Sequence, residues 1–146
     1  MATEGIMIRD GAQCVLGFDA RNSTNSGSTL AGPNGSGQFL LVRLSTTTDR
    51  TVLLNSTATT GVRGYGVLQN KGSTGQAADV CIFGITKLVA GGTIGGGGRI
   101  QATSTAPGTA IAYSSAADVF CVGNALESAT VGQVFTAFIY GFGQLG

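Results

Sequence analysis

Short apolar runs separated by clusters of Gly, Ser, Thr and Asn recur along the whole chain. The runs are rich in β-branched and aromatic residues, and no long stretch repeats its apolar positions with helical spacing, so the pattern predicts an all-β fold. The predicted strands are Gln13–Phe18, Gln38–Leu44, Thr51–Leu54, Val62–Gln69, Ala78–Val89, Arg99–Ala102, Thr109–Ala112, Val119–Leu126 and Gln133–Tyr140. So many short strands in 146 residues favour a small single-domain β-barrel or β-sandwich.

We expect the two faces of the last predicted strand to have different roles. One face carries Val134, Thr136, Phe138 and Tyr140, and the other carries Phe135, Ala137 and Ile139. Because both faces are largely apolar, we expect one to lie against the core and the other against a partner. Val134, Phe138 and Tyr140 are our hypothesis for a subunit interface. The earlier run VCIFGITKLV is two-sided in the same way, and Gly84 within it predicts a bulge or a bend.

The chain divides into an extended N-terminal arm, residues 1–12, and one β domain, residues 13–146. The arm alternates weakly, with Ile6 and Ile8 against Met7 and Arg9, and a partner orders such an arm more readily than its own domain does. Residues 19–37 form a long, polar, Gly-rich loop within the domain, and loops of that length are usually functional or disordered.

The amino-acid composition excludes several classes of function. The chain has no His, so a Ser-His-Asp triad and a His-ligated metal site are unavailable. A net charge of +1 and a charged fraction of 10% give no basic surface for nucleic acid. The apolar fraction of 42% and the mean hydropathy of +0.29 are sufficient to fill a core.

The cysteines and the chain ends bear on the compartment. Cys14, Cys81 and Cys121 are widely spaced and lie in apolar runs, which predicts buried thiols rather than a zinc or redox site. The first residues lack the basic start and continuous apolar segment of a signal peptide, and the apolar C-terminal stretch is too short and Gly-broken to span a bilayer. We therefore expect a soluble protein made in a reducing cytoplasm, without membrane contact.

No motif for catalysis emerges. The Gly-rich segments 32–37 and 95–98 are not followed by the GK[ST] of a phosphate-binding loop. The carboxylates are scattered singly; paired glycosidase carboxylates meet only in the fold, but so small a domain with few loops is poorly suited to hold a sugar. Tyr65 and Tyr113 are candidates for sugar stacking, although core or edge packing is the stronger expectation. We expect no enzyme activity, no cofactor and no metal.

The second half of the chain contains a series of distinctive segments. They are Gly66–Asn70 (GVLQN), Gly75–Val80 (GQAADV), Gly84, Thr86–Lys87 with Val89–Ile94 (VAGGTI), Gly123–Glu127, which fits a G-x-A-L-E pattern, and Gly132–Gln133. Together these segments resemble the capsid decoration (cement) proteins of tailed bacteriophages. The sequence departs from the family pattern at Gly72 and Asn124. The shared residues are mainly turn glycines and apolar strand positions, so the resemblance speaks for fold first.

The resemblance implies a virion structural protein, made in the host cytoplasm, that binds the outer surface of the mature capsid. It further implies a homotrimer that bridges major capsid proteins. We expect the arm to add as an edge strand to the capsid or to a neighbouring subunit. The proposed capsid-contact residues in it are Thr3, Glu4, Gly5, Ile6, Met7, Ile8 and Arg9. The alternative is another virion surface module, fibre-like or binding host glycans, although the 19–37 loop lacks the exposed aromatics that such a module would use.

Overall fold

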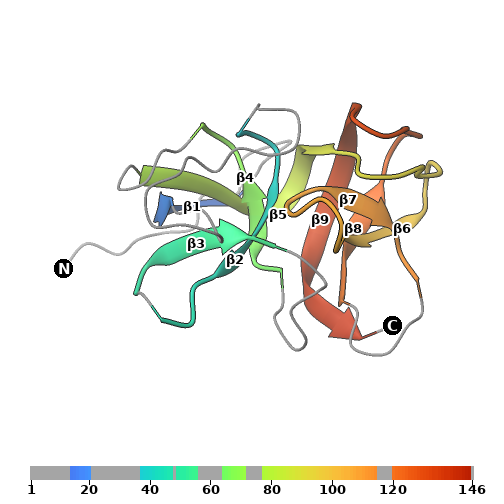
Figure 1. Cartoon of the computed structure of the whole chain (residues 1–146). Helices are drawn as coiled ribbons and strands as arrows, with labels where there is room; N and C mark the ends of the chain where they lie inside the picture. Colours follow the sequence, from blue (N-terminus) through green and yellow to red (C-terminus); the bar gives the residue numbers. More distant parts are fainter. Residues whose placement is uncertain are drawn as a thin grey trace.

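The computed structural model describes residues 14–20, 37–47, 49–55, 64–71, 77–114 and 120–145, with only the backbone given for residues 14–20 and 141–145. These residues contain strands, bridges and turns but no helix, which confirms the all-β prediction (Figure 1). The strands are β1 (Cys14–Ala20), β2 (Leu41–Leu44), β3 (Thr51–Leu54), β4 (Gly66–Leu68), β5 (Ala77–Val89), β6 (Arg99–Ala102), β7 (Ala110–Ala112), β8 (Phe120–Ala125) and β9 (Val134–Leu145).

Each predicted strand has a counterpart, and the differences lie at the ends. β2 begins three residues later than the predicted Gln38, because Phe39 has a φ of 60° and this left-handed backbone interrupts the extended run. β1 continues to Ala20, so the first two residues of the predicted polar loop belong to a strand, and residues 21–36 of that loop lie outside the described residues. β9 continues beyond Tyr140 to Leu145.

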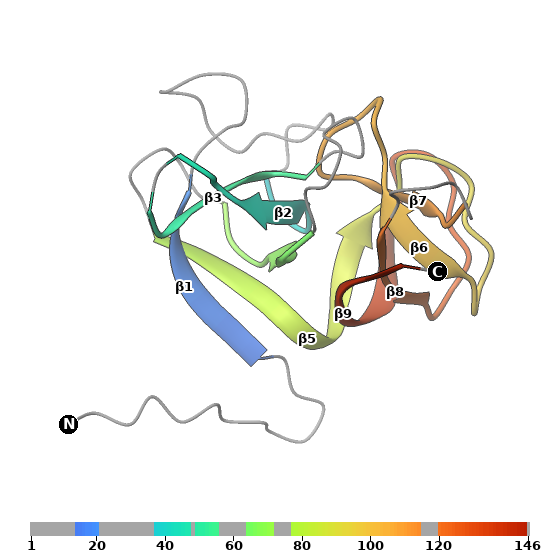
Figure 2. The same ribbon diagram turned by 90° about the horizontal axis from the view of Figure 1, so that it is seen from below.

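The strands form one curled sheet in the order β1-β3-β2-β4-β5-β9-β8-β6-β7, and a further pairing joins β1 to β5. That pairing closes β1, β3, β2, β4 and β5 into a hydrogen-bonded ring, in which only β1 and β3 are parallel. In the other half, β5, β9, β8, β6 and β7 pair antiparallel, and a bridge between Ala90 and Ala110 links the two ends. Figure 2 shows β5 running from one half into the other.

β5 belongs to both halves because it turns at Gly84, whose φ of 113° is reached easily only by glycine. Up to Phe83 the strand pairs with β1 and β4, and from Gly84 onward it pairs with β9. The bend predicted at this glycine is therefore confirmed.

Each half has its own apolar core. In the first half Leu40, Val42, Val52 and Leu68 are among the buried residues. The core of the second half also reaches Leu41, Val67 and Cys81 of the first, so the two cores adjoin. On β9, Phe135, Ala137 and Ile139 are buried, while Val134 is 51% exposed and Thr136, Phe138 and Tyr140 are partly exposed. The predicted division of this strand into a core face and a second face is thus confirmed.

Candidate protein-binding face

A row of four side chains crosses the outside of the second half. Ile85 on β5 lies opposite Phe138 on β9, Phe138 lies opposite Asn124 on β8, and Asn124 lies opposite Arg99 on β6. Residues opposite each other in an antiparallel pair share a face, and strands lie about 4.8 Å apart, so the row spans roughly 14 Å. We use the term outer face for this row and its neighbours: Phe83, Ile85, Arg99, Tyr113, Asn124, Phe138 and Tyr140.

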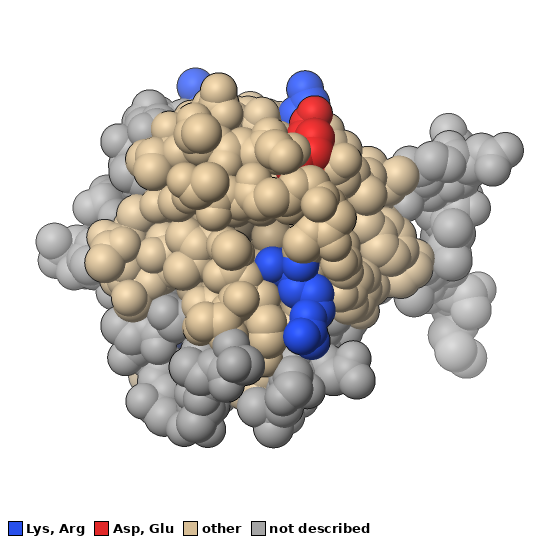
Figure 3. Space-filling model, turned by 90° about the vertical axis from the view of Figure 1, so that its right-hand side faces the viewer, with Lys and Arg blue, Asp and Glu red and all other residues tan. Residues whose placement is uncertain are grey.

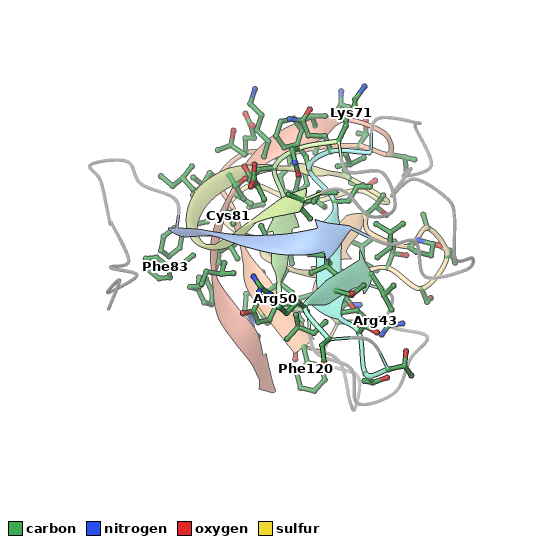
Figure 4. All side chains as sticks on the ribbon, turned by 90° about the vertical axis from the view of Figure 1, so that its left-hand side faces the viewer. Arg43, Arg50, Lys71, Cys81, Phe83 and Phe120 are labelled. Carbon is green, nitrogen blue, oxygen red and sulfur yellow. The ribbon has the colours of Figure 1, made fainter. Side chains whose placement is uncertain are left out.

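Aromatic rings form the centre of the outer face. The Phe83 and Phe138 rings meet edge to face, with centroids 5.4 Å apart, and the Phe138 and Tyr140 centroids are 5.7 Å apart. Phe83 is 42% exposed and Ile85 is 44% exposed. Figure 4 shows Phe83 beside the start of β1, where it pairs with Cys14. So much apolar side chain left in water by neighbouring strands is typical of an interaction surface.

A polar network holds the Tyr140 ring in place. Its hydroxyl donates a hydrogen bond to Asn124 Oδ1, and Asn124 Nδ2 donates to the Gly97 carbonyl at 3.0 Å. The Cys121 Sγ lies 3.7 Å from the same hydroxyl. Burial and the contact with Cys121 raise the pKa of Tyr140, which outweighs the opposing charge of Arg99. The phenol is therefore neutral near pH 7 and remains a donor.

Arg99 and Tyr113 form a stacked pair at one end of the outer face. The guanidinium carbon lies 4.7 Å from the Tyr113 ring centroid, and the Tyr113 N–H donates to the Arg99 carbonyl at 2.8 Å. Arg99 is exposed and has no salt-bridge partner within the part of the chain that the structure describes. The ring restricts the guanidinium, which stays accessible to a partner.

Charges are sparse on this side of the molecule. Figure 3 shows a surface that is mostly uncharged, with a few basic groups and one small acidic region beside a basic group. Lys87 lies 6.0 Å from the Phe39 ring centroid. Hydrogen bonds from the Thr136 hydroxyl and backbone N–H lower the pKa of Glu127, and the charge of Lys87 lowers it further. Glu127 thus already has strong donors within its own chain.

A shallow pocket of about 320 Å³ adjoins this surface. Its lining residues are Phe39, Gln69, Ile85, Thr86, Lys87 and Thr136. Gln69 Nε2 donates to the Thr86 hydroxyl oxygen at 2.9 Å. Lys87 is the one titratable group in the lining, so the pocket has no acid–base pair of the kind hydrolysis uses.

The predicted interface residues lie where they can contact a partner. Phe138 and Tyr140 belong to the outer face, and Val134 is exposed at the start of β9. The proposed contact residues of the arm, Thr3 to Arg9, lie outside the described residues. Val134 lies opposite Val89 rather than within the central row.

Sequence analysis did not assign five members of the outer face to an interface: Phe83, Ile85, Arg99, Tyr113 and Asn124. Phe83 and Ile85 lie in the two-sided run VCIFGITKLV, where alternation was a usable signal. No sequence signal indicated a contact between Arg99 and Tyr113, because the two residues meet only through the pairing of β6 with β7. Tyr113 stacks on Arg99, and Tyr65, the other proposed sugar-stacking residue, packs against the core of the first half.

The described residues offer little for metal or redox chemistry. They contain no group of three or more His, Cys, Asp or Glu side chains that could hold a metal ion. Cys81 and Cys121 are free thiols and buried, as predicted, whereas the Cys14 side chain lies outside the description. Nor does the described chain form a helix long and apolar enough to cross a membrane.

Comparison with known proteins finds a likeness among solved structures. No protein-family model matches the chain, and no curated protein matches it. Among solved structures the chain is similar to one described as the head fiber gp8.5 N base of bacteriophage phi29, with a TM-score of 0.57 and 22% sequence identity. The alignment covers 86% of this chain and 94% of that one. At this identity the likeness shows a common fold.

Proposed function

We propose that this chain is a virion structural protein that binds the outer surface of a mature phage capsid and stabilises the shell by bridging major capsid proteins. The observation that carries the proposal is the outer face, where exposed aromatic, aliphatic and arginine side chains surround no catalytic group. The fold shared with a phage head fibre base and the resemblance to decoration proteins both support a place on the virion.

The surface chemistry suits this role. Tyr, Phe and Arg are enriched at the centres of protein interfaces, and low charge reduces the desolvation that close contact would cost. We propose that copies associate as a homotrimer through Val134, Phe138 and Tyr140. Several copies joined in one particle gain avidity for a repeating shell, because later contacts form at high effective concentration.

Co-sedimentation with phage heads tests the function directly. Purified protein is mixed with expanded, undecorated heads of the source virus, and unexpanded precursor heads serve as the control. We expect saturable binding to expanded heads only, and the copy number at saturation bounds the symmetry axes that are occupied. Failure to bind either kind of head would refute capsid decoration.

A fibre-like module is the second candidate, because the similar structure is described as a head fibre base. Such a module would attach to the virion at few positions and contact the host with its other end. A glycan array and a copy-number measurement on intact virions separate the two functions. Glycan binding together with a low copy number would favour the fibre-like module.

Deletion of residues 2–9 tests the proposed arm. We expect the shortened protein to lose binding to expanded heads, because the arm would no longer add as a strand to the capsid or to a neighbouring subunit. Circular dichroism should show an unchanged β spectrum, since the described strands begin at Cys14. Full binding by the shortened protein would contradict the role of the arm.

Substitution of Phe138 by Asp tests the proposed subunit interface. We expect a lower native mass by light scattering, because the introduced carboxylate would have to be desolvated where the ring now contacts Phe83 and Tyr140. Val134→Asp is a second variant, at a more exposed site less prone to disturb folding. Leu44→Asp, 39% exposed on β2, is the matched control. Folded Phe138→Asp and Val134→Asp proteins of unchanged mass would refute the interface.

A further inference from the structure

We propose that Arg99, held over the Tyr113 ring, binds a carboxylate on the first half of a second copy of this chain. The inference rests on the proposed assembly of copies through the outer face, and it adds the chemistry that orients them. It also assigns roles to two residues outside the proposed Val134–Phe138–Tyr140 interface.

The stacked pair has the geometry of a prepared carboxylate site. The guanidinium carbon lies 4.7 Å from the ring centroid, and the Arg99 side chain is nevertheless exposed to solvent. A planar guanidinium presents parallel N–H donors that match the two oxygens of a carboxylate. Because stacking restricts the side chain before binding, less conformational entropy is lost when the second partner arrives.

No described carboxylate of its own half pairs with Arg99, so a negative charge has to come from elsewhere. Among the described residues Arg99 has no salt-bridge partner, and the Glu127 carboxylate already accepts a hydrogen bond from the backbone N–H of Thr136. The opposite residue, Asn124, uses its side chain on Tyr140 and on the Gly97 carbonyl. A partner that covered this face without a carboxylate would leave the guanidinium desolvated and unpaired, which is costly.

A second copy carries the complementary charge. Asp49, between β2 and β3, and Asp79 on β5 are exposed in the first half, and neither forms a salt bridge with another described residue. The cation in one half and these carboxylates in the other make the chain complementary to itself. Apolar Ile85 and Phe83 continue the contact surface from the Arg99 row toward the first half, on the same strand as Asp79.

Other anionic partners fit less well. A polyanion such as nucleic acid would need several cations along one groove, whereas this surface is mostly uncharged (Figure 3). An acidic sugar would need a concave site, and the pocket of about 320 Å³ is lined by Lys87 and does not include Arg99 or Tyr113.

The test compares Arg99→Gln with Arg43→Gln, which removes the same charge from β2 in the other half. Self-association is measured by sedimentation equilibrium of the full chain. We expect Arg99→Gln to raise the dissociation constant for self-association about 30-fold, as at an interface hot spot. Arg43→Gln should leave this constant unchanged. Arg99→Lys keeps the charge but loses the planar fork, so we expect a loss of about 10-fold. The association of the wild-type protein should also weaken as salt is raised.

Two variants of Tyr113 test the stacking itself. Tyr113→Phe keeps the ring and should associate like the wild type, whereas Tyr113→Ala should weaken association while circular dichroism remains unchanged. Equal effects of the two Tyr113 variants would refute the positioning role of the ring.

Three outcomes would overturn the proposal. The first is a wild-type protein that is monomeric at every concentration. The second is an Arg99→Gln protein that associates like the wild type. If that variant also loses binding to heads, the carboxylate belongs to the shell protein. The third is Arg99-dependent binding of an acidic glycan. Since wild-type binding to heads is measured separately, failure of the proposed function would be recognised independently of Arg99.

Discussion

Replacement of Phe135 by Ala is expected to lower the free energy of unfolding by about 3–5 kcal/mol. Phe135 is 1% exposed and is the largest fully buried side chain among the described residues. It lies on β9 opposite Leu88 of β5, and removal of its ring would leave a cavity in the core of the second half. Urea denaturation followed by far-ultraviolet circular dichroism measures the change, since the chain has no Trp to report by fluorescence.

The matched control is Phe83→Ala, which deletes the same ring where it is 42% exposed. This substitution removes the edge contact with Phe138 but creates no buried cavity, so we expect a loss of about 1 kcal/mol. Similar losses for the two substitutions would contradict the assignment of Phe135 to the core and of Phe83 to the outer face.

Substitution of Gly123 by Ala should be comparably severe, at about 3 kcal/mol or more. A Cβ at this position would lie 2.1 Å from the Phe138 carbonyl oxygen and 3.1 Å from the Ile139 Cα. Both are backbone atoms of β9, so no side-chain rotation relieves the overlap, and β8 and β9 would have to separate. The same denaturation experiment measures the loss.

Gly95→Ala is the control for Gly123→Ala. A Cβ at Gly95 meets no atom within 4 Å, and its φ lies outside the left-handed region, so we expect a change within about 0.5 kcal/mol. A Gly123→Ala protein as stable as Gly95→Ala would show that the close pairing of β8 with β9 is wrong.

Strand identity could be predicted from the sequence because β-branched and aromatic runs alternate with turn residues along the chain. Thr51–Leu54 and Arg99–Ala102 have the predicted bounds. The predicted start of β2 failed at Phe39, where tertiary contacts impose a positive φ on an aromatic residue: its N–H donates to the Leu68 carbonyl, and its own carbonyl accepts from Val89. Local sequence preferences cannot predict a backbone conformation that is fixed by contacts with residues distant in the sequence.

The candidate site was predictable only in part, for the same reason. The alternation in β9 indicated that Phe138 and Tyr140 face away from the core, and the structure confirms this. The pairing of Arg99 with Tyr113 depends on the β6–β7 register, in which Ile100 lies opposite Ala112. No local pattern at either residue encodes that register, so composition and spacing did not reveal the stacked pair.

β5 makes the two halves one thermodynamic unit. Its residues pair with β1 and β4 before Gly84 and with β9 after it. Displacement of β5 from one half would therefore also break strand pairing in the other. A partner that binds only the native outer face therefore also stabilises the ring that contains β1. If copies associate through Arg99 as proposed, part of that binding free energy therefore also disfavours opening of β1, without any change of shape.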